Sequence, residues 1–119
     1  MAPGGPVSSS EDPAPRLFWS TTERSAAEAL ARELLEARLA ACIHVGATLR
    51  SLYHWRGEIE TAEETQLMIK TRDALYPPLE AAILARHPYE LPEIVVVPIS
   101  HGLPAYLQWI AAETSPQRD

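Results

Sequence analysis

The sequence has one cysteine and one lysine, and both shortages narrow the functions open to it. A single cysteine, Cys42, closes no internal disulfide and forms no Cys-x-x-Cys pair, so the chain needs no oxidising compartment. We therefore expect a cytoplasmic location. The single lysine, Lys70, a formal net charge of −6 and a pI of about 5.2 argue against a basic surface for a phosphate backbone. We expect no nucleic-acid partner.

Long apolar runs and the common catalytic motifs are also missing. No stretch approaches the roughly 18 apolar residues of a membrane span, and residues 1–15 lack the apolar core of a secretory signal. None of the five glycines falls in a G-x-x-x-x-G-K-S/T or G-x-G-x-x-G frame. No G-x-S-x-G elbow is present. The sequence therefore predicts no membrane partner, no nucleotide site of these types and no enzymatic activity.

The composition is that of one globular domain. With 119 residues, of which 46% are hydrophobic and 22% charged, the chain has room for one core but not for two. Prolines and glycines near the start oppose regular structure; they are Pro3, Gly4, Gly5, Pro6 and Pro13. We interpret residues 1–15 as a flexible N-terminal extension, residues 16–113 as the folded domain and residues 114–119 as a C-terminal tail.

Hydrophobic spacing predicts a strand, a helix and a long hairpin in the first part of the domain. Residues 16–21 are short, apolar and partly aromatic, as in a buried strand. Residues 25–38 repeat apolar positions at helical spacing, and Ser25 with Glu28 fits a capping box. Residues 41–55 predict a long strand bent at Gly46. A turn at residues 56–58 then leads to a returning strand formed by Ile59 and residues 66–71.

The second part of the domain repeats a helix and a strand and adds one more helix. Asp73 is placed to cap a helix that carries two prolines in its first turn and ends before Pro88. Residues 93–99 are β-branched and apolar on both faces, which predicts a central or interface strand. Pro104 opens a last helix. The order β-α-β-β-α-β plus a C-terminal helix predicts an α+β, ferredoxin-like fold.

For the single cysteine and for an acidic run, we favour a structural role over a functional one. Cys42 follows an alanine-rich helix end inside an apolar run, where a free thiol is typically a small, inert, buried side chain. An acidic run beside the hairpin turn predicts a solvated edge that discourages strand aggregation, with a weak cation patch as the alternative; it comprises Glu58, Glu60, Glu63 and Glu64.

The segment from His87 to Glu93 holds two prolines, an imidazole, a phenol and two carboxylates within seven positions. The prolines fix the backbone around these polar groups. Two interpretations stay open: a stiff connection from helix to strand whose polar groups satisfy turn amides, or a ligand-binding loop. In the second case imidazole and carboxylate suit a borderline cation such as copper or zinc.

The chain resembles the CutA divalent-cation-tolerance family in five ordered segments. They are Leu39–Cys42, Tyr53–Ile59, Met68–Thr71, His87–Glu93 and Tyr106–Trp109. The resemblance covers residues 17–110 and implies a ferredoxin-like subunit in a PII-like homotrimer, with the long hairpin exchanged in sheet pairing between subunits. A small domain with a two-faced apolar strand gains by burying it against a copy of itself.

The resemblance also implies a response to divalent metal ions, with copper or another divalent metal bound. The family's ligands include a cysteine at the end of the first strand, a histidine near the His-Pro-Tyr-Glu run and the glutamate of Pro-Glu-Ile. Here Glu93 matches and His87 is available, so these two are the metal candidates. Trp19 stands at the thiol position, and Arg86 stands where a second histidine can occur. Loss of a thiolate weakens the preference for Cu(I).

A second hypothesis is a PII-like small-molecule sensor or scaffold that uses clefts between subunits. One lysine on an otherwise apolar strand motivates it. The cleft candidates are Tyr53, Trp55, Lys70, Tyr89, Glu90, Tyr106 and Trp109. An acylphosphatase-like enzyme ranks last, because the arginine-bearing glycine loop of that chemistry is missing.

Overall fold

The computed structural model describes residues 15–86 and 91–116, and its elements follow the predicted order. The strands are β1 (Pro15–Thr22), β2 (Cys42–Trp55), β3 (Glu58–Arg72) and β4 (Ile94–Pro98). The helices are α1 (Arg24–Glu36), α2 (Tyr76–Arg86), preceded by a 3-10 turn η1 (Asp73–Leu75), and α3 (Pro104–Glu113). Of the predicted site residues, His87, Tyr89 and Glu90 lie outside the described ranges. None of the helices in those ranges is long and apolar enough to cross a membrane.

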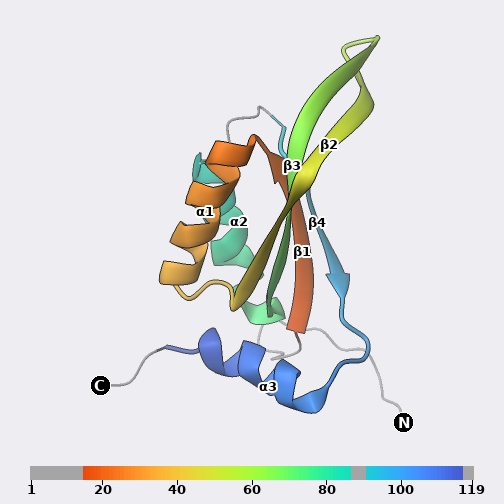
Figure 1. The fold of residues 1–119 in the computed structure, drawn as a ribbon. Coiled ribbons are helices and arrows are strands. Elements are labelled where there is room, and N and C mark those ends of the chain that lie inside the picture. Colours follow the sequence, from red (N-terminus) through yellow and green to blue (C-terminus); the bar gives the residue numbers. More distant parts are fainter. Residues whose placement is uncertain (1–14, 87–90, 117–119) are drawn as a thin grey trace.

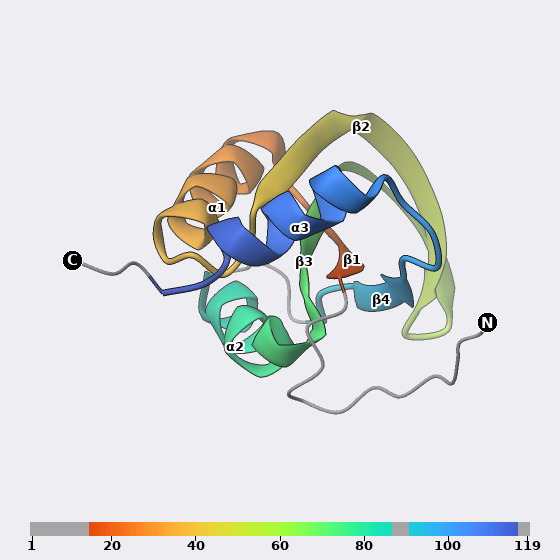
Figure 2. The ribbon, with the colours of Figure 1, turned by 90° about the horizontal axis from the view of Figure 1, so that it is seen from below.

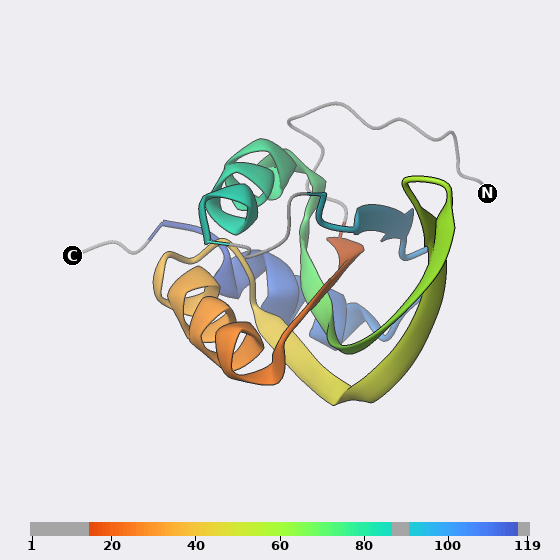
Figure 3. The same cartoon turned by 90° about the horizontal axis from the view of Figure 1, so that it is seen from above.

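The four strands form one antiparallel sheet in the order β2-β3-β1-β4, as expected for a ferredoxin-like split βαβ fold. Helices α1 and α2 cover one face of this sheet (Figures 1 and 3). The position of β4 decides between two alternatives only in part. Its run of β-branched residues predicted a central or interface strand; among the described residues β4 pairs only with β1, so it is an edge strand and not a central one, and the interface alternative stays a prediction. Val95 is 50% exposed and Val97 is 43% exposed.

The predicted hairpin between β2 and β3 is confirmed. It closes in a two-residue turn at Arg56 and Gly57, both with positive φ (54° and 83°), which suits the right-handed twist of a hairpin. A bulge between Val45 and Thr48 bends β2 where the bend was expected. Gly46 fits there because a Cβ at this position would stand 3.2 Å from the carbonyl oxygen of Gln66.

The acidic run was predicted beside the hairpin turn. It begins there, at Glu58, and lies within the first part of β3. Strand β1 pairs with β3 only as far as Thr65, so the outer part of the hairpin continues without a third strand. We call residues 49–64 the arm. It extends well beyond the sheet in Figure 1. Each strand of the arm therefore has one edge without a neighbouring strand among the described residues.

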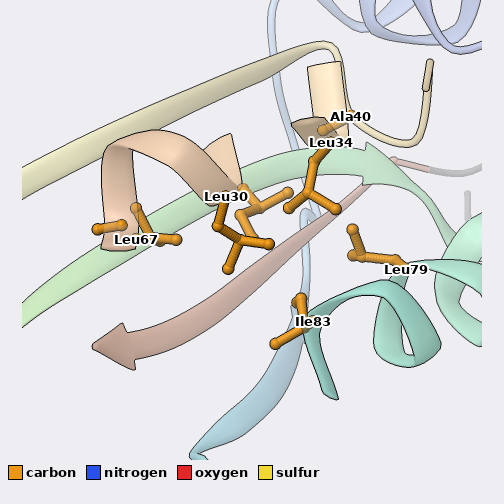
Figure 4. Close-up of a cluster of buried hydrophobic side chains, with 8 residues drawn as sticks. Leu30, Leu34, Ala40, Leu67, Leu79 and Ile83 are labelled. Carbon is orange, nitrogen blue, oxygen red and sulfur yellow. The ribbon is translucent and has the colours of Figure 1, made fainter. Parts of the chain in front are cut away.

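The core lies between the sheet and the two covering helices. Strand β3 alternates strictly, with Thr65, Leu67, Ile69 and Thr71 buried and the residues between them only partly so. Leu67 and Ile69 join buried side chains of both helices (Figure 4); these are Ala27, Leu30 and Leu34 from α1, and Leu79 and Ile83 from α2. The period of two in β3 meets the period of 3.6 in each helix, which gives one continuous apolar layer.

Both predicted helix starts differ in detail from the structure. Helix α1 begins at Arg24 with Glu23 as the N-cap residue and no side-chain cap bond, so the predicted capping box of Ser25 and Glu28 is wrong. Strand β1 ends at Thr22, and the chain enters the helix at once, with the Ala27 amide donating to the Glu23 carbonyl at 2.8 Å. Asp73 lies inside the 3-10 turn rather than at the cap position, which Arg72 occupies. The two prolines do lie in the first turn of α2.

Helix α3 lies across the end of the sheet where β2 begins and β3 ends (Figures 1 and 2). As predicted, Pro104 is its first residue. Two arginines hold its far end. Arg38 donates to the Glu113 carbonyl at 3.1 Å and to its carboxylate at 2.8 Å, and Arg72 donates to the hydroxyl and the carbonyl of Thr114, both at 2.8 Å. Ile110, a residue of this helix, is fully buried.

The division of α2 into a buried and an exposed side gives a stability prediction. Ile83→Ala should lower the free energy of unfolding by about 2–4 kcal/mol, because Ile83 is fully buried among core side chains and its truncation leaves a cavity. Leu84→Ala is the matched control on the next residue, which is 52% exposed, and should cost less than about 0.5 kcal/mol. Urea unfolding measures both values. Equal costs at the two positions would contradict this placement of the core.

Candidate functional site

The face of the sheet opposite α1 and α2 carries the chemistry-bearing side chains. In β3 the residues between the buried ones point this way, among them Met68 and Lys70. The pairing register sets Cys42 opposite Lys70 and His44 opposite Met68, so both β2 side chains share this face. Helix α3 borders the same area at the end of the sheet. Segments distant in sequence therefore meet here.

Lys70 is the centre of this group. Its Nζ lies 3.5 Å from Nδ1 of His44 and 5.7 Å from the centre of the Tyr106 ring. The ring of Tyr106 stacks on that of Trp109, with centroids 5.6 Å apart and planes inclined by 27°. On the other side of the imidazole, the Cys42 Sγ lies 3.8 Å from Nε2 of His44. We call these five residues the Lys70 cluster: Cys42, His44, Lys70, Tyr106 and Trp109.

The charge of Lys70 is not balanced by a neighbouring carboxylate. Within residues 15–86 and 91–116, Lys70 forms no ion pair, and its contacts are an imidazole and an aromatic ring face. Arg38 and Arg72 differ from it, because the end of α3 accepts hydrogen bonds from both. The cluster is also open to solvent, since Tyr106 is 38% and Trp109 41% exposed. It offers a cation beside a stacked aromatic pair, which suits an anionic ligand with a planar group.

Cys42 corrects a prediction from the sequence. It is partly exposed and lies on the sheet face opposite the core, so its interpretation as an inert buried thiol is wrong. The apolar neighbours Ile43 and Val45 are the residues that pack against the core. His44 was not singled out from the sequence at all. The alternation of a strand would have placed it beside Cys42, two residues away on one face.

The predicted cleft residues divide into two groups. Lys70, Tyr106 and Trp109 come together in the cluster, whereas Tyr53 and Trp55 lie on the arm at the opposite end of the hairpin (Figure 1). The Trp55 ring there carries the Arg56 guanidinium, whose central carbon lies 5.3 Å from the ring centroid. Tyr89 and Glu90 lie outside the described ranges. Within the described ranges, one chain therefore does not bring all of the predicted cleft residues together.

The predicted metal ligands are only partly described. Glu93 is exposed and directly precedes β4, and His87 lies outside the described ranges. In the part of the chain that the structure describes, no three His, Cys, Asp or Glu side chains gather as a metal centre would require. Arg86, which replaces a histidine of the family pattern, forms an ion pair with Glu33 and so ties the end of α2 to α1. The described residues alone therefore give no complete metal site, and the pairing of Glu93 with His87 stays a prediction.

A hollow of about 400 Å³ lies between α1 and α2. The Arg86–Glu33 pair lies at this hollow, whose other lining residues are Leu30, Leu34, Glu36, Ala37, Leu39 and Ala82. Near the start of α2 the Tyr76 phenol donates a hydrogen bond to the Glu80 carboxylate, and this bond raises the pKa of Tyr76 above its usual value of 10.0. Both features lie on the helix side of the sheet, away from the Lys70 cluster.

Comparison with known proteins gives a consistent family. A family model described as CutA1 divalent ion tolerance protein matches residues 16–113. The divalent-cation tolerance protein CutA of Thermus thermophilus is 41% identical over 88 residues, which are 74% of this chain and 85% of that protein. Protein CutA of Mus musculus is 38% identical over 93 residues, 78% of this chain. The match spans only 52% of the mouse protein.

Solved structures of similar proteins have the same fold. The CutA structure from Xylella fastidiosa is 41% identical, with a TM-score of 0.83 over 86% of this chain and 99% of that one. The CutA1 structure from Oryza sativa is 31% identical, with a TM-score of 0.84 over 92% of this chain and 100% of that one. The ferredoxin-like arrangement of strands and helices is therefore shared with experimental structures.

Proposed function

The chain belongs to the CutA1 divalent ion tolerance family, and from that membership we propose that it acts as a homotrimer in the tolerance of divalent metal ions. The observation that carries the assembly is exposed apolar surface on the arm and on β4. Leu52 is 66% exposed, Ile59 71% and Val95 50%. Large apolar side chains left exposed in this way point to a binding surface on each of these two elements. A second copy of the chain is the partner that the family resemblance implies.

Unpaired strand edges support the same assembly. In the part of the chain that the structure describes, the arm has no third strand and β4 pairs on one side only. Such edges attract other strands unless they are covered. If the arm of one copy pairs along an edge of the next, the contact is head-to-tail, and a threefold rotation closes it into a ring. This exchange would bury Leu52 and Ile59 without a change in the fold of the subunit.

Metal binding in this proposal rests on Glu93 together with His87. A carboxylate and an imidazole suit copper or zinc in the divalent state. The thiol position of the family pattern is Trp19 here, so the site would be less selective for Cu(I). No catalytic residue enters the proposal, since the protein would bind ions rather than transform a substrate. We place it in the cytoplasm, in keeping with its single thiol.

The Lys70 cluster favours a second candidate function, the PII-like sensing of a small anionic molecule. An ammonium group that has no carboxylate partner within residues 15–86 and 91–116 stands beside two stacked rings on one wall. In a ring of subunits, the arm of a neighbouring copy could bring Tyr53 and Trp55 over this wall. Such a cleft would bind an anion through Lys70 and a planar group through the aromatic rings.

The assembly proposal predicts a mass in solution of three times the chain mass of 13.1 kDa. Ile59→Lys should reduce that mass, because a charge would be forced into a buried apolar contact. Leu84→Lys is the control, a similar change on an exposed residue of α2. Size-exclusion chromatography with light scattering measures all three proteins. A wild-type protein that elutes as a monomer would refute the assembly.

The metal proposal predicts saturable binding of Cu(II) or Zn(II) that weakens at least about tenfold in Glu93→Gln, because one ligand oxygen loses its charge. Glu28→Gln removes an exposed carboxylate on α1, away from Glu93 in the sequence, and should leave binding unchanged. Calorimetric titration with each metal alone measures the affinities, and circular dichroism checks folding. Equal affinities in the wild type and Glu93→Gln would reject Glu93 as a ligand.

The sensing candidate predicts that an anionic small molecule raises the melting temperature. A ligand at 100 times its dissociation constant stabilises the folded state by about 2.7 kcal/mol. A thermal-shift screen with nucleotides and organic acids tests this, and Lys70→Met should abolish any shift found. Arg50→Met removes an exposed cation from the arm and should preserve it. A screen without any hit would count against this function.

A further inference from the structure

Cys42, His44 and Lys70 form a line of three polar groups that neither function above uses as a unit. The imidazole of His44 stands in the middle, with Nε2 3.8 Å from the Cys42 Sγ and Nδ1 3.5 Å from the Lys70 Nζ. Cys42 and His44 are two residues apart on one face of β2, and Lys70 comes from the neighbouring strand opposite Cys42. The paired strands therefore hold all three groups without help from a loop.

The contact with Lys70 determines which ring nitrogen of His44 carries the hydrogen in the neutral imidazole. An ammonium group has hydrogens to donate and nothing with which to accept. Nδ1 of His44 must then be the acceptor, and in the neutral imidazole the hydrogen lies on Nε2. Nε2–H points at the sulfur, so the ring serves the thiol as a donor. The ring N–H is thereby placed to hydrogen-bond to the Cys42 sulfur.

The surroundings of the thiol are those of a reactive cysteine. Reactive thiols are partly exposed and lie beside Lys, Arg or His, whereas structural thiols are buried among apolar groups. Cys42 is partly exposed, His44 is exposed, and Lys70 has no carboxylate to neutralise it in the described part of the chain. A nucleophile, a partner within reach and a third group that orients the partner are the recurring parts of an activated site.

We propose that Cys42, His44 and Lys70 form a thiol-exchange site at which Cys42 is reversibly modified by small, anionic, low-molecular-weight disulfides. The Cys42 thiolate attacks one sulfur of the reagent, the S–S bond of the reagent breaks, and a mixed disulfide forms with Cys42. The Cys42 sulfur is oxidised, and the departing sulfur is reduced. It leaves as a thiolate and takes up the proton that Cys42 released. A second small thiol reverses the step.

The preference for an anion comes from Lys70. Its ammonium group lies beyond the imidazole of His44, 3.5 Å from Nδ1, and on the same sheet face as Cys42. A carboxylate on the reagent would be drawn to this charge, an attraction that salt screens. The stacked rings of Tyr106 and Trp109 border the same area and limit the size of the group that can enter. The site is independent of the metal proposal, which uses neither Cys42 nor His44.

Two disulfides of matched size but different charge test the proposal on the intact protein. They are 3,3′-dithiodipropionate, which is a dianion, and hydroxyethyl disulfide, which is neutral. Because the chain has one cysteine, mass spectrometry of the whole protein counts each modification directly. Relative to the model thiol N-acetylcysteinamide, Cys42 should react about threefold to tenfold faster with the anionic reagent at low salt. This advantage should disappear at high salt.

Matched variants assign the roles. Lys70→Met should abolish the preference for the anionic reagent, and Lys70→Arg should retain it because the charge is kept. His44→Val should slow both reagents at least about threefold, whereas His54→Val, on the arm, should leave both rates unchanged. Circular dichroism and light scattering verify that each variant keeps its fold and assembly. The proposal is overturned if Cys42 reacts only after denaturation, if it reacts no faster than the model thiol, or if His44→Val matches the wild type.

Discussion

The strict alternation of side chains along β3 is the constraint on which both faces of this molecule depend. Leu67 and Ile69 point into the core beneath α1 and α2, while Met68 and Lys70 point to the opposite face. A shift of one residue in the pairing would expose the leucine and bury the ammonium group. The apolar core therefore fixes the register, and the register in turn sets Cys42 opposite Lys70. Stability and chemistry are linked through one strand.

The folded chain has a well-buried core and an arm whose apolar side chains are exposed to solvent. Between the sheet and the helices, the large side chains are completely covered. On the arm, Leu52 and Ile59 are exposed, and no third strand covers the edges. Folding of one chain thus buries the apolar side chains of the inner half of the hairpin only. The same division separates the two groups of aromatic residues, since Tyr106 and Trp109 lie beside the sheet while Tyr53 and Trp55 lie on the arm.

Much of the fold could be predicted because periodicity and turn residues are local signals. The strand at β4, the bend at Gly46 and the helix start at Pro104 were all found this way. The capping box failed because a matching pair of residues does not say where the preceding strand ends. Cys42 was misplaced because its hydrophobic neighbours concealed the alternation that turns it outward. The contact between His44 and Lys70 joins residues 26 positions apart in the sequence, and it depends on the exact register of the hairpin, which the bulge shifts.

The bulge between Val45 and Thr48 separates the hairpin into an inner stretch, which packs against the core, and an outer stretch, which is the arm. On the inner side, the residues are constrained by packing against the core and by the pairing that sets Cys42 opposite Lys70. On the outer side, they are constrained only by the contacts that the arm makes. Extending or shortening the arm by one residue on each strand beyond the bulge would leave the inner pairing as it is. Evolution can therefore vary the reach and charge of the arm while the scaffold stays constant, and a protein engineer can graft a new arm at the same point.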